Sequence, residues 1–118
     1  MTNKFTILGS GSSLGVPRID GDFGKCNPND QKNYRTRCCA HLKFNDISIL
    51  IDTSPDLRSQ LLRNKIKDVD YVLYTHAHAD QTHGINDLRA FYIKYRKRLN
   101  VYADRLTKKH LMSSFGYC

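Results

Sequence analysis

Three side chains of types that bind metals, His76, His78 and Asp80, lie within the segment His76-Ala77-His78-Ala79-Asp80. Apolar residues at 69–75 predict a strand that ends at this segment. Residues two apart in an extended chain project to the same side, so His76 and His78 can share one ion. Two neutral imidazoles and a carboxylate suit zinc, iron or manganese, and such an ion converts bound water into hydroxide near neutral pH. The spacing therefore predicts a hydrolytic metal site.

A strand and a glycine-rich loop are expected at the start of the chain. Residues 4–8 alternate polar and apolar types, with Phe5 and Ile7 on the apolar side of a half-buried strand. The glycines of residues 9–17 permit tight turns, but their spacing differs from that of a dinucleotide-binding loop. Residues 20–37 contain few apolar side chains, which predicts a long exposed excursion.

The middle of the chain predicts a hairpin followed by a helix. Residues 40–44 and 47–51 flank an Asn-Asp turn and indicate two paired strands. Ser54 is the expected N-cap of the helix, whose apolar face comprises Leu57, Leu61 and Leu62. Beyond the histidines, the pattern predicts a helix over 87–98, a short strand over 100–103 and a final helix that begins at 104–107.

These features together resemble the metallo-β-lactamase superfamily, whose signature H-x-H-x-D-H follows a strand. The shared features are the strand and T-H-x-H-x-D, Gly84 beyond them, the opening glycine-rich loop and the segment I-D-T-S-P-D. Within the superfamily the chain is most similar to the cyclic-phosphate phosphodiesterases of phosphonate utilisation, through G-S-G-S-S-L-G-V-P, I-D-T-S-P-D-L-R and G-I-N-D-L-R. Transfer-RNA 3′-processing nucleases share the glycine-rich loop but usually carry D-C-G-E-G-T where this chain has D-T-S-P-D, and they are the alternative.

The resemblance implies a fold and roles for individual residues. The fold is of the layered α/β class: residues 1–118 are one incomplete domain, the N-terminal half of an αββα sandwich, with a mostly mixed sheet and flanking helices. His76 and His78 would hold a first divalent metal, zinc or manganese. Asp80 would hold a second metal and act as the catalytic residue that orients the attacking water. Asp52 would support the cluster from the neighbouring strand, as a hydrogen-bond acceptor for the ligating histidines. The implied substrate is a small, cyclic phosphodiester.

The sequence departs from the family pattern in two ways. Gln81 stands where the family has its second-metal histidine, and a carboxamide is a poor ligand for such a metal. His83 is a weak candidate to replace it. The family's later histidine and aspartate ligands have no counterpart here, since the only later histidine, His110, falls in a predicted surface helix.

A half sandwich should leave one apolar sheet face without a partner. We expect such a chain to self-associate or to bind a separately encoded C-terminal half, and to be inactive as a hydrolase by itself. The final residues, 113–118, lack the character of a helix stop and are expected to belong to an interrupted sequence.

Composition places the chain among ordinary globular proteins, with 40% hydrophobic and 25% charged residues in 118. The sequence shows neither a membrane-spanning apolar run nor a signal peptide, so a cytoplasmic location is expected. The four cysteines should then remain thiols. Cys26, Cys38 and His41 are alternative zinc ligands, although their spacing matches no common zinc finger.

A net charge of +8 suggests a second class of function. Basic residues are frequent late in the chain, especially over 94–98, and a basic surface attracts polyanions such as nucleic acid. The alternative to an enzyme is therefore a non-catalytic module that binds polyanions. A solvated helix face or loop explains the same residues without a partner, so nucleic acid binding is not the favoured interpretation.

Overall fold

The computed structural model describes residues 3–118 and contains one five-stranded sheet in the order β1-β2-β3-β4-β5. The first three strands pair antiparallel, whereas β4 and β5 each join in parallel. A parallel connection needs a crossover, and the chain makes these crossovers through helices. The strands are β1 (Lys4–Gly9), β2 (Cys39–Phe44), β3 (Ile47–Ile51), β4 (Tyr71–Leu73) and β5 (Asn100–Tyr102). The expected hairpin and the mixed sheet are confirmed.

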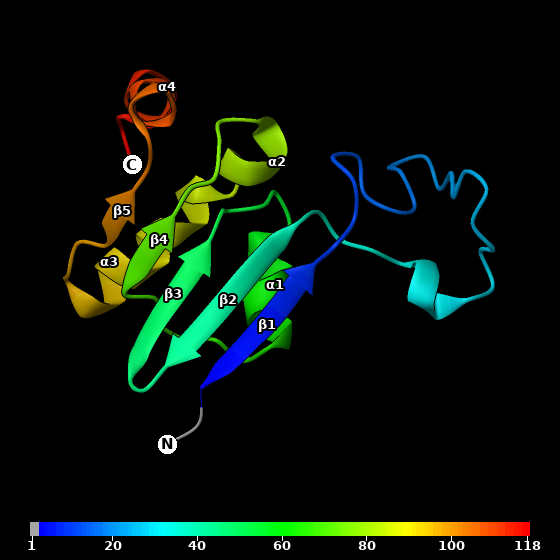
Figure 1. Ribbon diagram of the computed structural model, residues 1–118, viewed down its shortest axis with the longest axis horizontal. Coiled ribbons are helices and arrows are strands. Elements are labelled where there is room, and N and C mark those ends of the chain that lie inside the picture. The colour runs from blue at the N-terminus through cyan, green and yellow to red at the C-terminus, as the bar shows by residue number, and fades with distance from the viewer. Residues whose placement is uncertain (1–2) are drawn as a thin grey trace.

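The helices are short and lie mainly on one face of the sheet. Figure 1 shows α1 and α3 behind the strands, and α2 and α4 beyond the strand ends. The α-helices are α1 (Leu57–Arg63), α2 (Ala79–Thr82), α3 (Arg89–Tyr95) and α4 (Arg105–Phe115), and 3-10 turns occur at η1 (Gln31–Asn33) and η2 (Ile85–Leu88). The helix expected over 87–98 is thus divided between η2 and α3, and it ends where Arg96 adopts a left-handed conformation, with φ 56°.

The hydrophobic core fills the space between the sheet and α1. Leu50 of β3, Val72 of β4 and Leu57 of α1 are fully buried, and Leu8 of β1 is nearly so. Successive strand residues point to opposite faces, so Leu50 and Val72, which pair across β3 and β4, lie on the same covered side. This core holds β3 and β4 in register: the segment after β4 carries the predicted metal ligands, and Asp52 follows β3.

The opposite sheet face is apolar and open. Phe5 and Ile7 are 57% and 68% exposed, and Leu73 and Tyr102 are also exposed on this face. In Figure 1, no helix of the described residues covers it. The interpretation of Phe5 and Ile7 as the buried side of the first strand was wrong: Leu8 is the residue of β1 that enters the core. The expected uncovered apolar face is present.

The start of α1 also differs from the sequence expectation. The N-cap is Asp56, not Ser54. The Ser54 hydroxyl donates to Gln60 Oε1 at 2.7 Å and accepts from the Asp56 backbone at 3.1 Å, which forms a turn before the helix begins. Leu62 is 63% exposed, so of the three predicted leucines only Leu57 and Leu61 are buried.

The excursion between β1 and β2 is long and largely exposed, as predicted. It extends away from the sheet in Figure 1 and returns along residues 35–37, which contact the glycine-rich loop through bridges to Gly11 and Val16. A Cβ on Gly9 would clash with the Arg37 carbonyl oxygen, so this close return requires glycine. Within residues 3–118, no helix has the length and apolar character needed to cross a membrane.

Candidate metal centre

The predicted metal ligands lie beside the ends of β3 and β4. Because these strands run parallel, their carboxyl ends meet at one edge, and Asp52 follows β3 there while Thr75 and His76 come just after β4. The Asp52 backbone N–H donates to the Leu73 carbonyl at 2.8 Å. Asp52 has φ +63°, a left-handed conformation that non-glycine residues seldom adopt outside special sites. This conformation ends β3 and turns the carboxylate toward the histidine segment.

A hydrogen-bond relay connects Asp52 to His76. The carboxylate accepts from the Thr75 backbone N–H and from the Thr75 hydroxyl, both at 2.8 Å. Thr75 has one hydroxyl proton, so with Asp52 ionised its oxygen accepts from His76 Nδ1, 3.0 Å away. The Nε2 lone pair of His76 is then free for a metal. Burial raises the pKa of Asp52, while its bonds to Thr75 oppose that rise.

His76 and His78 lie together, as the two-residue spacing predicts. Their ring centroids are 4.5 Å apart and the rings are nearly perpendicular, at 82°. Both side chains are exposed, so a metal and its water can reach them from solvent. The pair supplies two nitrogen ligands on one accessible side of the loop.

The turn after the histidines is tied closely to the end of β3. The Thr53 backbone donates to the Gln81 carbonyl at 2.8 Å, and Gly84 donates to the Thr53 carbonyl at 3.0 Å. A Cβ at Gly84 would clash with the Ser54 carbonyl oxygen. The glycine noted in the sequence therefore permits a close approach of two backbones, and this approach places α2, with Asp80 and Gln81, beside the strand ends.

Cys38, at the end of the excursion, is a neighbour of α2 that sequence reasoning did not connect with the metal site. Its Sγ lies 3.1 Å from Gln81 Nε2 and 3.8 Å from Asp80 Oδ2. Burial raises the pKa of the Cys38 thiol, the bond from Gln81 lowers it, and the nearby Asp80 charge raises it further. No signal in the sequence linked Cys38 to residues more than 40 positions away.

The weak candidate His83 is placed elsewhere. Its ring lies 5.8 Å from that of Phe115 in α4, in an edge-to-face arrangement, and His110 contacts the same phenylalanine. The alternative zinc set is also not assembled, because Cys26 is exposed in the excursion and His41 bonds to Ser48 at 2.7 Å in the sheet. Neither group of residues supplements the histidine pair.

The ligands present fit part of a metal centre. Within residues 3–118, no three or more His, Cys, Asp or Glu side chains converge as a complete metal-binding group. His76 and His78 nevertheless provide adjacent nitrogen donors, and the other ring nitrogen of His76 bonds to Thr75, as in metal-bound histidines. The donor set therefore suits a divalent metal, but it is incomplete in this part of the chain.

Comparison with known proteins identifies the family. Residues 48–118 match the beta-lactamase superfamily domain. The chain belongs to the metallo-β-lactamase superfamily. A solved structure of a new diphosphatase from the PhnP family superposes with a TM-score of 0.91 and is 38% identical, over 99% of this chain and 47% of that one. The resemblance inferred from the glycine-rich loop and the histidine motif is confirmed.

Two other known proteins are similar to this chain. An octanoyltransferase of Porphyromonas gingivalis is 42% identical over 84% of this chain, which spans only 20% of that protein. Human tRNase Z, short form, superposes with a TM-score of 0.70 at 16% identity, over 98% of this chain and 40% of that one. At such low identity the likeness to tRNase Z concerns the fold alone. The chain spans less than half the length of each of these relatives.

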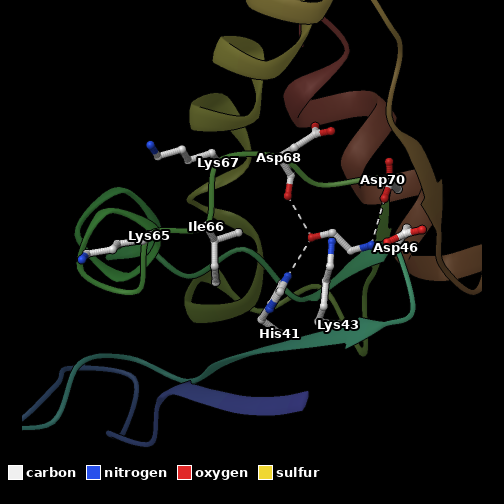
Figure 2. Close-up of a pocket in the computed structure, with 9 residues that line it drawn as sticks. His41, Lys43, Asp46, Lys65, Ile66, Lys67, Asp68 and Asp70 are labelled. Carbon is white, nitrogen blue, oxygen red and sulfur yellow. Dashed lines mark hydrogen bonds between the residues drawn. The ribbon is translucent and has the colours of Figure 1, made fainter. Parts of the chain in front are cut away.

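The superfamily chain also has a pocket at the other end of its sheet, away from the histidines. This cavity has a volume of about 370 Å³. Figure 2 shows His41 and Lys43 side by side in it, with Asp68 and Asp70 above them. The Ser48 hydroxyl accepts from His41 and donates to the Asp68 carbonyl at 2.8 Å. These bonds, together with the bond from the Ser48 backbone to Asp70, tie β2 and β3 to the segment that precedes β4.

The basic segment over 94–98 is partly neutralised. Lys97 forms ion pairs with Asp68 at 3.0 Å and Asp70 at 2.8 Å, and these pairs raise the pKa of its ammonium group. Lys94 lies over the Tyr95 ring, 5.4 Å from its centroid. These contacts give the segment a structural role and weaken the case for a continuous polyanion-binding stripe.

Proposed function

We propose that this chain carries the first metal-binding part of a hydrolase that cleaves phosphorus–oxygen bonds in small, cyclic phosphodiesters. The observation that carries the proposal is the adjacent pair His76 and His78, with Asp52 and Thr75 orienting the first ring. The relative with 38% identity is described as a diphosphatase, which supports phosphorus chemistry for this superfamily member.

Each residue of the site has a separate role in this proposal. His76 and His78 would hold a divalent metal, zinc or manganese, through ring nitrogens, and Thr75 would keep the His76 proton on Nδ1. When bound, the metal supplies a hydroxide nucleophile near neutral pH and polarises a phosphoryl oxygen. The Asp80 carboxylate, on the turn that follows, orients the attacking water and accepts its hydrogen bond. Asp52 stays fixed by Thr75 and balances part of the added positive charge.

A pocket lined by arginines supports the proposal that the substrate is anionic. A cavity of about 420 Å³ beside the excursion is lined by Arg35, Arg37 and Arg63 and contains one acidic residue, Asp56. Arg37 forms a bidentate pair with Asp56, at 2.6 and 2.9 Å, which lowers the pKa of that carboxyl. Arg35 and Arg63 remain to attract a phosphoryl group, and guanidinium groups match its oxygens in geometry.

The proposal includes low activity for the 118 residues by themselves. The described residues hold no complete group of three metal ligands, and Gln81 replaces an imidazole. Self-association, or a separately encoded partner that contributes further ligands, would then be needed for full turnover.

Metal analysis tests the proposal directly. We expect the purified chain to bind about one zinc or manganese ion, and the His76→Ala/His78→Ala double variant to bind none, measured by elemental analysis after dialysis. A His83→Ala/His110→Ala double variant is the matched control, because it removes the same number of imidazoles elsewhere and should retain the metal.

Hydrolysis of a bis-aryl phosphodiester by the same samples measures activity. Little or no turnover by the chain alone is expected. Equal metal content in both double variants would overturn the proposed role of the histidine pair, whereas robust turnover by the isolated chain would contradict its low activity.

A further inference from the structure

The side chain of Gln81 contains an unusual buried atom. Gln81 is only 5% exposed, and among the described side chains that are not exposed its Oε1 is the buried oxygen without a hydrogen-bond partner. Burying an amide oxygen without a partner costs roughly 1–3 kcal/mol, so native proteins rarely leave one. The amide at the position of a family metal ligand thus has one acceptor that no group of the described residues satisfies.

The neighbours of this amide are themselves metal-binding types. Gln81 Nε2 donates to Cys38 Sγ at 3.1 Å, and the same sulfur lies 3.8 Å from Asp80 Oδ2. Cys38 forms no disulfide and is half-buried. It arrives from the end of the excursion, while Asp80 and Gln81 belong to α2, so the fold brings two potential ligands, Cys38 and Asp80, together from separate segments.

The distances suit shared coordination. Sulfur and oxygen bound to one tetrahedral zinc, at bond lengths of about 2.3 and 2.1 Å, lie about 3.6 Å apart. The Cys38–Asp80 separation of 3.8 Å is close to that value. Thiolate is also the ligand that soft and borderline ions such as zinc and cadmium prefer, in contrast to manganese.

We propose that Cys38 and Asp80 bind a thiophilic divalent metal, zinc by preference, at the second position of the centre. Gln81 positions this site: its amide N–H holds the sulfur, and Oε1 of the same amide is an acceptor that nothing in the described residues satisfies. The thiolate replaces the imidazole that the Gln81 substitution removes. This inference rests on the proposed metal centre but assigns a ligand, Cys38, that the histidine motif does not contain.

Cobalt binding provides a readout that does not depend on catalysis. We expect Co²⁺ added to the purified chain to produce a near-ultraviolet band from thiolate-to-metal charge transfer, together with weaker visible bands. Cys38→Ser should abolish the charge-transfer band, and Cys26→Ser, which alters an exposed cysteine of the same excursion, should retain it. We also expect Cys38→Ser to weaken Cd²⁺ binding by more than about tenfold, since losing even an outer-shell partner has an effect of this size.

The outcomes separate this inference from the proposed function. Visible cobalt bands that depend on His76 and His78 but lack a charge-transfer band would overturn the role of Cys38 and leave the histidine site intact. Failure of the chain to bind cobalt at all would overturn both. Restoration of tight binding without the charge-transfer band in Cys38→Ser/Gln81→His would support the exchange of thiolate for imidazole.

Alkylation of the unmodified protein covers the case in which a variant does not fold. Cadmium should protect Cys38 from iodoacetamide while Cys26 remains reactive, as measured by peptide mass spectrometry. Equal labelling of Cys38 with and without cadmium would contradict the proposal.

Discussion

The two faces of the sheet carry similar apolar side chains but have different surroundings. On the covered face, Leu50 and Val72 are fully buried beneath the helices. On the other, Ile7 and Leu73 remain exposed because nothing in residues 3–118 packs over them. A hydrophobic residue contributes to stability only when a second surface removes it from water, at about 25 cal/mol per Å².

The difference explains why alternation along a strand does not predict which of its two faces is buried. Alternation identifies which residues share a face, but both faces of this sheet are rich in apolar residues. In β1, the pattern favours Phe5 and Ile7 as the buried set, yet Leu8 enters the core. The position of the helices, and not the hydrophobicity of a strand, determines which face is buried here.

The largest expected effect comes from truncation on the covered face. Leu50→Ala should lower the free energy of unfolding by about 2–5 kcal/mol, because it removes buried contacts and leaves a cavity. Ile7→Ala on the open face is the matched control and should cost less than about 0.5 kcal/mol, as at other surface positions. Urea unfolding followed by circular dichroism measures both. Similar losses in the two variants would show that the open face is covered in solution.

A smaller effect on the covered face depends on pH. Burial lowers the pKa of His41 below its ordinary value of 6.5, and the charges of Lys43 and Lys4 add to the shift. The unfolded chain therefore takes up this proton at higher pH than the folded chain. Stability should fall as the pH drops through 6.5, until the folded-state pKa is passed.

His41→Gln tests this pH dependence. The urea midpoint of the variant should vary less between neutral and mildly acidic pH than that of the unmodified protein. His110→Gln, in α4, should behave like the unmodified protein. If His41→Gln retains the full slope, another group is responsible for the loss of stability in acid.

The smallest expected change in stability, but a clear change in association, comes from charging the open face. Ile7→Lys/Leu73→Lys should reduce self-association in sedimentation velocity at little cost in unfolding free energy, since exposed apolar patches promote association. Met112→Lys, at an exposed position on α4, is the control for added charge. Equal sedimentation of all three proteins would remove the open face as an association surface.

Local patterns predicted most of the fold. The hairpin of β2 and β3 followed from two apolar runs around a short turn, and the strand before the histidines followed from a run of apolar residues. The start of α1 did not follow, because Ser54 bonds to Gln60 and Asp56 pairs with Arg37, a partner from the distant excursion. Capping depends on which partners reach the helix end, and the segment itself does not contain that information.

The sequence by itself determined that His76 and His78 lie together, because residues two apart in an extended segment project to the same side. It also determined membership of the superfamily, through motifs carried by contiguous residues. Only the tertiary structure decided that Cys38 lies against Gln81 and that Thr75 links Asp52 to His76. Contacts between distant segments arise from sheet register and from close backbone approach at Gly84, and neither is encoded in the spacing of the residues that meet.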